Sequence, residues 1–193
     1  MSNIVISGSG LFIPPHTVSN DELIQAYNAY VEKFNAENAA AIEAGDVEAL
    51  PTSSSEFVEK ASGIKSRYVM YKEGMLDPER MAPTFKPALA GDEPETVTMA
   101  IAAGREAMEQ ANKKPEDIDL VIMGTTNHQR PYPSAAVEVQ QKLGIKGFAY
   151  DMGIACSTMT FAMINAFTAL KAGTAKCVLV VNPEFASPQV NLK

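Results

Sequence analysis

The 193-residue sequence predicts an α/β fold in which a β-sheet lies between layers of helices. Residues 120–123 and 176–181 read as strands that show no polar alternation, which is typical of strands covered on both faces. Amphipathic and apolar helical patterns alternate with these strands along the chain. This alternation favours a sheet between helix layers.

The first third of the chain is predicted to hold two strands and several helices. A β-branched run stops at Pro14, where the backbone loses a donor. Ser19, followed three residues later by Glu22, forms the pattern of a capping box, so a helix is expected to begin at about residue 20. The elements expected here are a strand at 4–13, that helix, its continuation over 38–50 with a break at Gly45, a short helix at 56–62 and a strand at 67–71.

The remainder of the chain begins with residues 72–95, which hold four prolines without a sustained period. We expect a structured excursion over the surface there. The elements expected after it are a helix at about 97–111, a turn at 115–117, a strand at 120–123, a helix at 134–143, a strand at 148–152, an apolar helix from about 155 to 171 and a last strand at 176–181.

Composition excludes several classes of protein. The formal net charge of -7, with no basic stripe, argues against a nucleic-acid-binding protein. No apolar run reaches the roughly 18 residues that a membrane span needs, and residues 1–10 lack the pattern of a secretory signal, so we expect a cytoplasmic protein. Its two cysteines, Cys156 and Cys177, fit neither a disulfide framework nor a metal-binding spacing, which favours reduced thiols and no metal.

Cys156 stands at the front of the apolar stretch "CSTMTFAMINAFTAL". A helix beginning at Ala155 would place its thiol beside unpaired backbone N–H groups, whose partial positive charge favours the thiolate. A first-turn amide there could also stabilise an oxyanion in acyl transfer. The alternative is that Cys156 only packs, because a free cysteine is among the most buried residue types. For Cys177, which leads a strand, packing is the better interpretation.

Three stretches carry a family resemblance: "VISGSGLFIPPHTVSNDEL", "FVEKASGIKSRYV" and "GTTNHQRPYPSAAVEVQQKLGIKGFAYDMGIACSTMTFAM". In this order they resemble the amino-terminal half of a β-ketoacyl-acyl carrier protein synthase III, a condensing enzyme of the thiolase superfamily. The resemblance implies the layered αβαβα fold, with residues 1–193 as one amino-terminal domain that has a mixed five-stranded sheet and insertions at about 28–54 and 72–94. The insertions are either a lid or altered acyl tunnel, or plain surface.

The resemblance also implies a chemistry and three site residues. Cys156 would take an acyl group from a coenzyme A thioester, and the acyl enzyme would condense with malonyl-acyl carrier protein; no cofactor is bound permanently. Tyr132 matches a bulky residue that reaches across a homodimer interface to close the partner's acyl tunnel; the alternative is an ordinary packed turn residue between two prolines. Phe57 stands where a tryptophan often stacks on the coenzyme A adenine. Ala61 replaces a basic contact to the cofactor, and Thr158 replaces a smaller residue.

The family takes a catalytic histidine and asparagine from its carboxy-terminal half, and that half is absent from this sequence. His16 and His128 match neither position. We therefore expect a second half or second polypeptide to complete the site. We also expect an exposed apolar flank on this chain, because one sheet would lack its pseudo-symmetric mate. The alternative function is a non-catalytic partner or dimerisation subunit of a condensing-enzyme complex.

Overall fold

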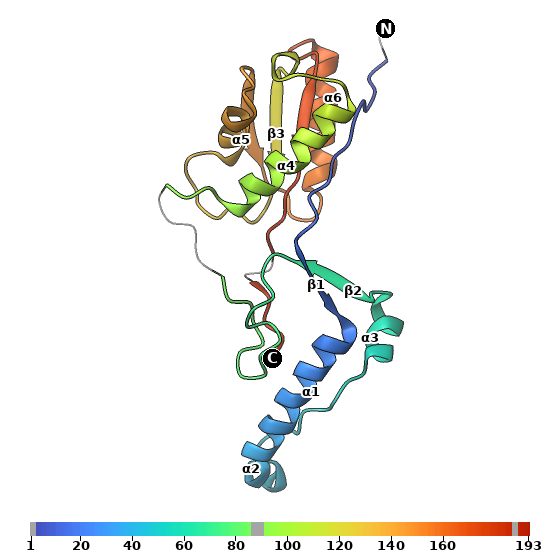
Figure 1. The fold of residues 1–193 in the computed structure, drawn as a ribbon, viewed down its shortest axis with the longest axis vertical. Coiled ribbons are helices and arrows are strands. Elements are labelled where there is room, and N and C mark those ends of the chain that lie inside the picture. The colour runs from blue at the N-terminus through green and yellow to red at the C-terminus, as the bar shows by residue number, and fades with distance from the viewer. Residues whose placement is uncertain (1–2, 86–90, 187–188) are drawn as a thin grey trace. The chain divides into compact units, whose positions relative to one another are not determined.

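The computed structural model describes residues 3–85, 91–186 and 189–193 (Figure 1). The chain divides into two compact units. The first comprises residues 1–12 and 87–185, and the second comprises residues 13–86 and 186–193. The expectation of a single domain over residues 1–193 stays a prediction.

The first unit is built on a parallel sheet of three strands in the order β4-β3-β5. The central strand is buried along its whole length, as its apolar sequence predicts. The elements of this unit are α4 (Glu95–Gln110), a short 3-10 helix (Pro115–Asp117), β3 (Leu120–Gly124), α5 (Ala135–Leu143), β4 (Phe148–Met152), α6 (Thr158–Ala172) and β5 (Val178–Val181).

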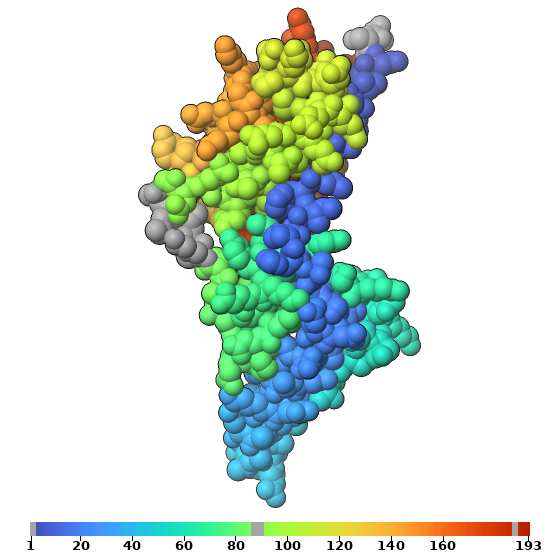
Figure 2. Space-filling model, in the orientation of Figure 1, coloured from blue at the N-terminus to red at the C-terminus, as the bar shows by residue number. Residues whose placement is uncertain are grey.

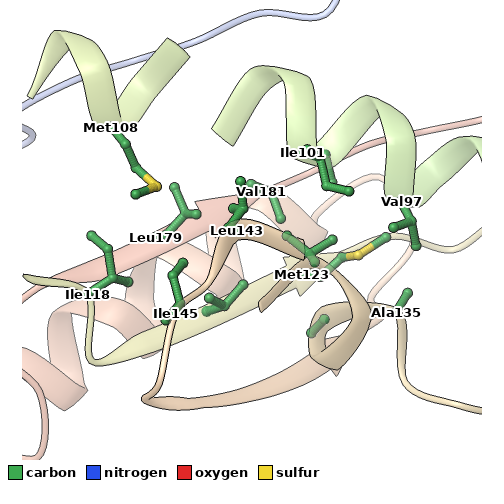
Figure 3. Close-up of a cluster of buried hydrophobic side chains, with 14 residues drawn as sticks. Val97, Ile101, Met108, Ile118, Met123, Ala135, Leu143, Ile145, Leu179 and Val181 are labelled. Atoms are coloured by element: carbon green, nitrogen blue, oxygen red, sulfur yellow. The ribbon is translucent and has the colours of Figure 1, made fainter. Parts of the chain in front are cut away.

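Side chains of β3 alternate between two helix layers. Val121 and Met123 belong to a core cluster that also draws on α4, α5 and β5. Figure 3 shows this cluster, with side chains from the helices gathered around the sheet. Leu120 and Ile122 point to the opposite face and pack with alanines of α6. The predicted α/β architecture, with a sheet between helix layers, is confirmed.

Helix α6 has two unlike faces. Its inner face presents the small residues Ala162 and Ala166 to the sheet. Its outer face leaves Phe161, Ile164 and Phe167 between 42% and 53% exposed. An apolar face of this kind is expensive to leave in water, since each fully buried aromatic or aliphatic side chain contributes about 1.5–3 kcal/mol. The structure thus has an exposed apolar flank, as predicted, and it lies on a helix rather than on a sheet.

The second unit pairs β1 (His16–Ser19) with β2 (Ser66–Val69) in an antiparallel ribbon. Between these two strands the chain forms α1 (Asn20–Glu37), α2 (Ala39–Ala44) and α3 (Ser55–Ser62). Both halves of the predicted capping box at the start of α1 are present. Asn28 and Asn35, seven residues apart on α1, each exchange two hydrogen bonds with the returning backbone at Ser53 and Leu50. The segment 28–54 is therefore a hairpin tied along α1.

The prediction of one mixed five-stranded sheet is wrong in its details. In the described part of the chain the five strands form two separate sheets, one parallel with three strands and one antiparallel with two. The two sheets belong to different units. Short strands such as these carry little information about their partners, because pairing is set by tertiary contacts rather than by local pattern.

The predicted first strand, residues 4–13, is also wrong: its described residues form no strand. The backbone amides of Ser9 and Leu11 donate instead to a glutamine and a glutamate side chain of α4, at 2.6 and 2.7 Å. Gly10 allows this close approach, because a Cβ there would lie 2.1 Å from a carbonyl oxygen of α4. Figure 2 shows the segment, in blue, lying against the yellow-green α4.

The predicted surface excursion at residues 72–94 falls partly outside the described residues, which omit 86–90. Its described parts, 72–85 and 91–94, contain turns and neither a helix nor a strand. Met81 in this segment is fully buried and shares a cavity lining with Leu23 and Tyr27, so part of the excursion packs near α1. Across the described ranges, none of the helices has both the length and the apolar character needed to cross a membrane.

Candidate active site

The carboxyl ends of the three parallel strands meet at one edge of the sheet. The register pairs Gly124 with Met152 and Met123 with Val181, so the loops that follow β3, β4 and β5 leave from the same side. Thr125 donates its amide to the carbonyl of Met152, at 3.0 Å, which joins two of these loops. Ligand sites of parallel sheets lie at this edge, and the candidate site is therefore sought there.

Cys156 lies on an exposed turn that leaves this edge after β4. The helix behind it begins at Thr158, so the predicted start at about Ala155 is wrong. Ala155 has a φ of 43°, a left-handed conformation that a helix cannot include. The amide of Ser157 closes the turn by donating to Ile154 O at 3.0 Å. The thiol thus lies immediately in front of the helix end, and its nucleophilic role stays a prediction.

Tyr132 lies on the loop between β3 and α5. Asp151 of β4 fixes the start of α5, since its carboxylate accepts the amides of Ala135 and Ala136 at 3.1 and 2.7 Å. Arg130, on the other side of Tyr132, pairs with Glu138 through both carboxylate oxygens. Both attachments leave the Tyr132 ring 83% exposed. The loop is anchored while its aromatic residue points into solvent.

Glu184 connects the loops after β3 and β5 and was missed by the sequence analysis. Its carboxylate accepts the backbone amide of Thr126 at 3.0 Å and the side-chain amide of Asn127. An acidic residue three positions after the end of an apolar strand is the signal that could have indicated it. Glu184 stiffens the loop that leads to Tyr132, and it does so from the same sheet edge that carries Cys156.

Phe57 belongs to the second unit, whereas Cys156 and Tyr132 belong to the first. It occupies the first turn of α3, and its amide donates to the capping hydroxyl of Ser54 at 3.1 Å. Its ring is 66% exposed and lines a cavity of about 690 Å³ together with Leu23, Ile24, Tyr27 and Met81. An exposed aromatic ring that lines a cavity is suited to stacking against a planar ligand group.

Cys177 lies at the opposite, amino edge of the sheet, just before β5. It is half-buried and packs against the larger core cluster, and this burial raises the pKa of its thiol. A raised thiol pKa lowers the fraction of thiolate at neutral pH, which agrees with a packing role. In the portion of the chain that the structure describes, no three histidine, cysteine or acidic residues gather in a way that could hold a metal ion.

The chain is similar to known proteins in both sequence and fold. Residues 150–193 match the family described as 3-oxoacyl-[acyl-carrier-protein (ACP)] synthase III. Over 88% of the chain, the sequence is 48% identical to a β-ketodecanoyl-[acyl-carrier-protein] synthase of Pseudomonas aeruginosa, of which this stretch covers 49%. This chain is a relative of the 3-oxoacyl-[acyl-carrier-protein] synthases III. Its thiolase-like α/β architecture agrees with that relationship.

Two further similarities extend the relationship. A β-ketoacyl-[acyl-carrier-protein] synthase III of Brucella anthropi is 36% identical over 72% of this chain and 37% of its own length. The crystal structure of 3-oxoacyl-[acyl-carrier-protein] synthase III from Aquifex aeolicus matches 97% of this chain and 47% of its own, with a TM-score of 0.69 and 27% identity. The chain spans about half the length, or less, of these synthase III relatives.

Proposed function

We propose that this chain is the nucleophile-bearing half of an acyltransferase of the 3-oxoacyl-acyl carrier protein synthase III type. One observation carries the proposal: Cys156 stands on an exposed turn at the carboxyl edge of the parallel sheet, directly in front of the apolar helix α6. The similarity to named synthases over most of the chain supports it. The other thiol, Cys177, is half-buried at the opposite edge of the sheet.

The first step is transfer of an acyl group to sulfur. The Cys156 thiolate attacks the carbonyl carbon of an acyl-coenzyme A thioester, a C–S bond forms, and coenzyme A leaves as its thiolate. The oxyanion of the tetrahedral intermediate gains stability from backbone N–H groups at the front of α6 other than those of Ser157 and Thr158, which donate to Ile154 and Ala155. Phe57 supplies an exposed ring on which the adenine of coenzyme A stacks.

The second step forms the carbon–carbon bond. Malonyl-acyl carrier protein loses carbon dioxide, and the resulting enolate carbon attacks the acyl carbonyl on Cys156, which expels the cysteine thiolate. An enolate needs hydrogen-bond donors, and the two histidines of this chain, His16 and His128, belong to its second and first units, respectively. We assign this stabilisation to a histidine and an asparagine on a second half of the fold.

The partners follow from the exposed apolar surface. The outer face of α6, with Phe161, Ile164 and Phe167, is covered by the second half. Tyr132, on its anchored loop, reaches a second copy across a homodimer interface and closes the acyl tunnel there. Acyl carrier protein delivers the malonyl group, no other cofactor is bound permanently, and the assembly works in the cytoplasm.

The acyl group that we propose is of medium length. The Pseudomonas aeruginosa relative is named for a β-ketodecanoyl product. Because decarboxylative condensation adds two carbons, such a product requires an octanoyl primer. We therefore propose octanoyl-coenzyme A, ahead of acetyl-coenzyme A, as the acyl donor.

The test is intact-protein mass spectrometry of the protein, expressed from its complete reading frame, after incubation with octanoyl-coenzyme A or acetyl-coenzyme A. We expect one octanoyl adduct, mapped by proteolysis to Cys156, and slower acetylation. Cys156→Ala removes the adduct. Cys177→Ala, the matched control at the other edge, retains it.

The alternative function predicts a different outcome. A folded protein that forms no adduct with either thioester contradicts the acyltransferase. If that protein also purifies with a condensing enzyme, the result supports a non-catalytic dimerisation subunit. The exposed apolar face of α6 is the feature that favours this alternative.

A further inference from the structure

Thr158, the first residue of α6, has a buried hydroxyl that bonds twice to the turn carrying Cys156. Only 1% of the residue is exposed. Its Oγ1 accepts the backbone N–H of Ile154 at 2.8 Å and donates to the carbonyl oxygen of Ala155 at 2.7 Å. Both bonded groups belong to the two residues immediately before Cys156. The hydroxyl therefore braces the backbone turn from which the Cys156 side chain projects.

The turn needs this support because its backbone is strained. Ala155 has a φ of 43°, which brings a Cβ close to its own carbonyl oxygen. Two donors hold that carbonyl: the Thr158 amide at 3.1 Å and the Thr158 hydroxyl. Without the hydroxyl, the Ile154 N–H loses its partner, and the Ala155 carbonyl keeps only its hydrogen bond from the Thr158 amide. Strained conformations of this kind persist only where the surroundings over-determine them.

Packing fixes the direction in which the hydroxyl points. The methyl group of Thr158 faces the end of β3, where a Cβ added to Gly124 would lie 2.6 Å from it. Threonine has few χ1 rotamers, so a methyl locked against the sheet also locks the hydroxyl toward the turn. Glycine at 124 leaves the space that this arrangement requires.

We infer that Thr158 is a positioning residue for Cys156: its hydroxyl ties Ile154 N–H to Ala155 C=O and thereby holds the thiol in one orientation for acyl transfer. The inference rests on the proposed function, since it assumes that Cys156 is the nucleophile. It also gives a role to the threonine that stands where the sequence resemblance leads one to expect a smaller residue.

Three variants separate the hydroxyl from the shape of the side chain. Thr158→Val keeps the shape and removes the hydroxyl, Thr158→Ser keeps the hydroxyl, and Thr158→Ala removes both branches. Single-turnover acylation of Cys156 is measured against octanoyl-coenzyme A concentration, in the protein from its complete reading frame. We expect Thr158→Val to lower the maximal rate by about tenfold or more with an unchanged half-saturating concentration. Thr158→Ser should stay within about threefold of the unsubstituted protein.

Hydrogen exchange at the Ile154 amide supplies a readout that needs no substrate. The amide should exchange at least about tenfold faster in Thr158→Val than in Thr158→Ser. If Thr158→Val does not fold, Thr158→Ala takes its place and is expected to show the same losses. A folded valine variant that is acylated at the unsubstituted maximal rate overturns the inference and leaves the proposed function standing. An unsubstituted protein that is never acylated overturns the proposed function, and the exchange rates then decide alone whether Thr158 locks the turn.

Discussion

The two edges of the parallel sheet are built differently. At the amino edge the Asp119 carboxylate accepts the amides of Lys176 and Cys177 at 2.6 and 3.1 Å, while its carbonyl accepts the amide of Phe148 at 2.9 Å. At the carboxyl edge, residues 153–157 are all exposed. One edge joins three strands through a single residue, and the other leaves a turn open to solvent. The contrast teaches that the contacts that hold the strands together gather at the amino edge, while the candidate site lies at the carboxyl edge, where ligand sites of parallel sheets lie.

Two glycines that flank β4 give the strongest test of this contrast. A Cβ at Gly147, on the amino side, would lie 1.9 Å from the backbone oxygen of Asp119, whereas a Cβ at Gly153, on the carboxyl side, would meet only Thr125 O at 3.1 Å. We expect Gly147→Ala to lower the free energy of unfolding by at least about 3 kcal/mol, and Gly153→Ala by less than about 1 kcal/mol. Urea denaturation followed by circular dichroism measures both.

A glycine with no neighbours serves as the control for that pair. Gly173 already has a positive φ of 73°, which strains an alanine placed there. The substitution causes no clash, since nothing lies within 4 Å of the Cβ position. It is expected to cost about 1 kcal/mol. Equal losses at Gly147 and Gly153 would contradict the view that the amino edge is the tightly packed one.

The two thiols should also differ between the edges. Cys156 at the carboxyl edge should react faster than Cys177 at the amino edge, although this effect is smaller than that of the glycine substitutions. Cys156 is exposed, whereas burial raises the pKa of Cys177. We expect iodoacetamide at about neutral pH to alkylate Cys156 at least about tenfold faster, because alkylation requires an accessible thiolate. Peptide mapping after timed quenching measures both rates. The difference should vanish in concentrated urea, and a native protein in which Cys177 reacts first would refute it.

Local chemistry allowed much of this fold to be predicted from the sequence. Ser19 and Glu22 indicated the start of α1, and Gly63 indicated the end of α3, because caps and left-handed glycines act over a few residues. The apolar run at 120–123 indicated a strand covered on both faces, and the structure buries every residue of β3. Cys156 was singled out as a candidate nucleophile for the same reason, because a thiol before an apolar helix is a local signal.

The features that sequence reasoning missed depend on distant contacts. Residues 4–13 have the composition of a strand, yet their amides bond to side chains of α4 some hundred positions away. Glu184 and Thr126, which bond to each other, are 58 positions apart. Thr158 was noticed only as an unusual substitution, because its two hydrogen bonds depend on the left-handed turn at Ala155, which no local pattern announced.

Asp119 offers the smallest and most specific test of the amino edge. Its backbone hydrogen bonds from Lys176 and Cys177 lower the pKa of its carboxyl group. A carboxylate with a lowered folded-state pKa stabilises the fold above its unfolded value of about 3.9, and this contribution is lost as the pH falls through the folded value. We expect Asp119→Asn to cost about 1 kcal/mol at neutral pH, a modest figure because solvent screens the group, and progressively less below about pH 4.

The measurement for Asp119 is urea denaturation of the native and Asp119→Asn proteins across the acid range, with Asp46→Asn, at an exposed aspartate outside the sheet, as the control. The gap between the native protein and Asp119→Asn should close on acidification, while Asp46→Asn should follow the native protein throughout. A gap that persists unchanged in acid would mean that the Asp119 side chain acts through its shape rather than its charge. Such a result would weaken the electrostatic account of the amino edge while leaving the packing of Gly147 against Asp119 as its main source of stability.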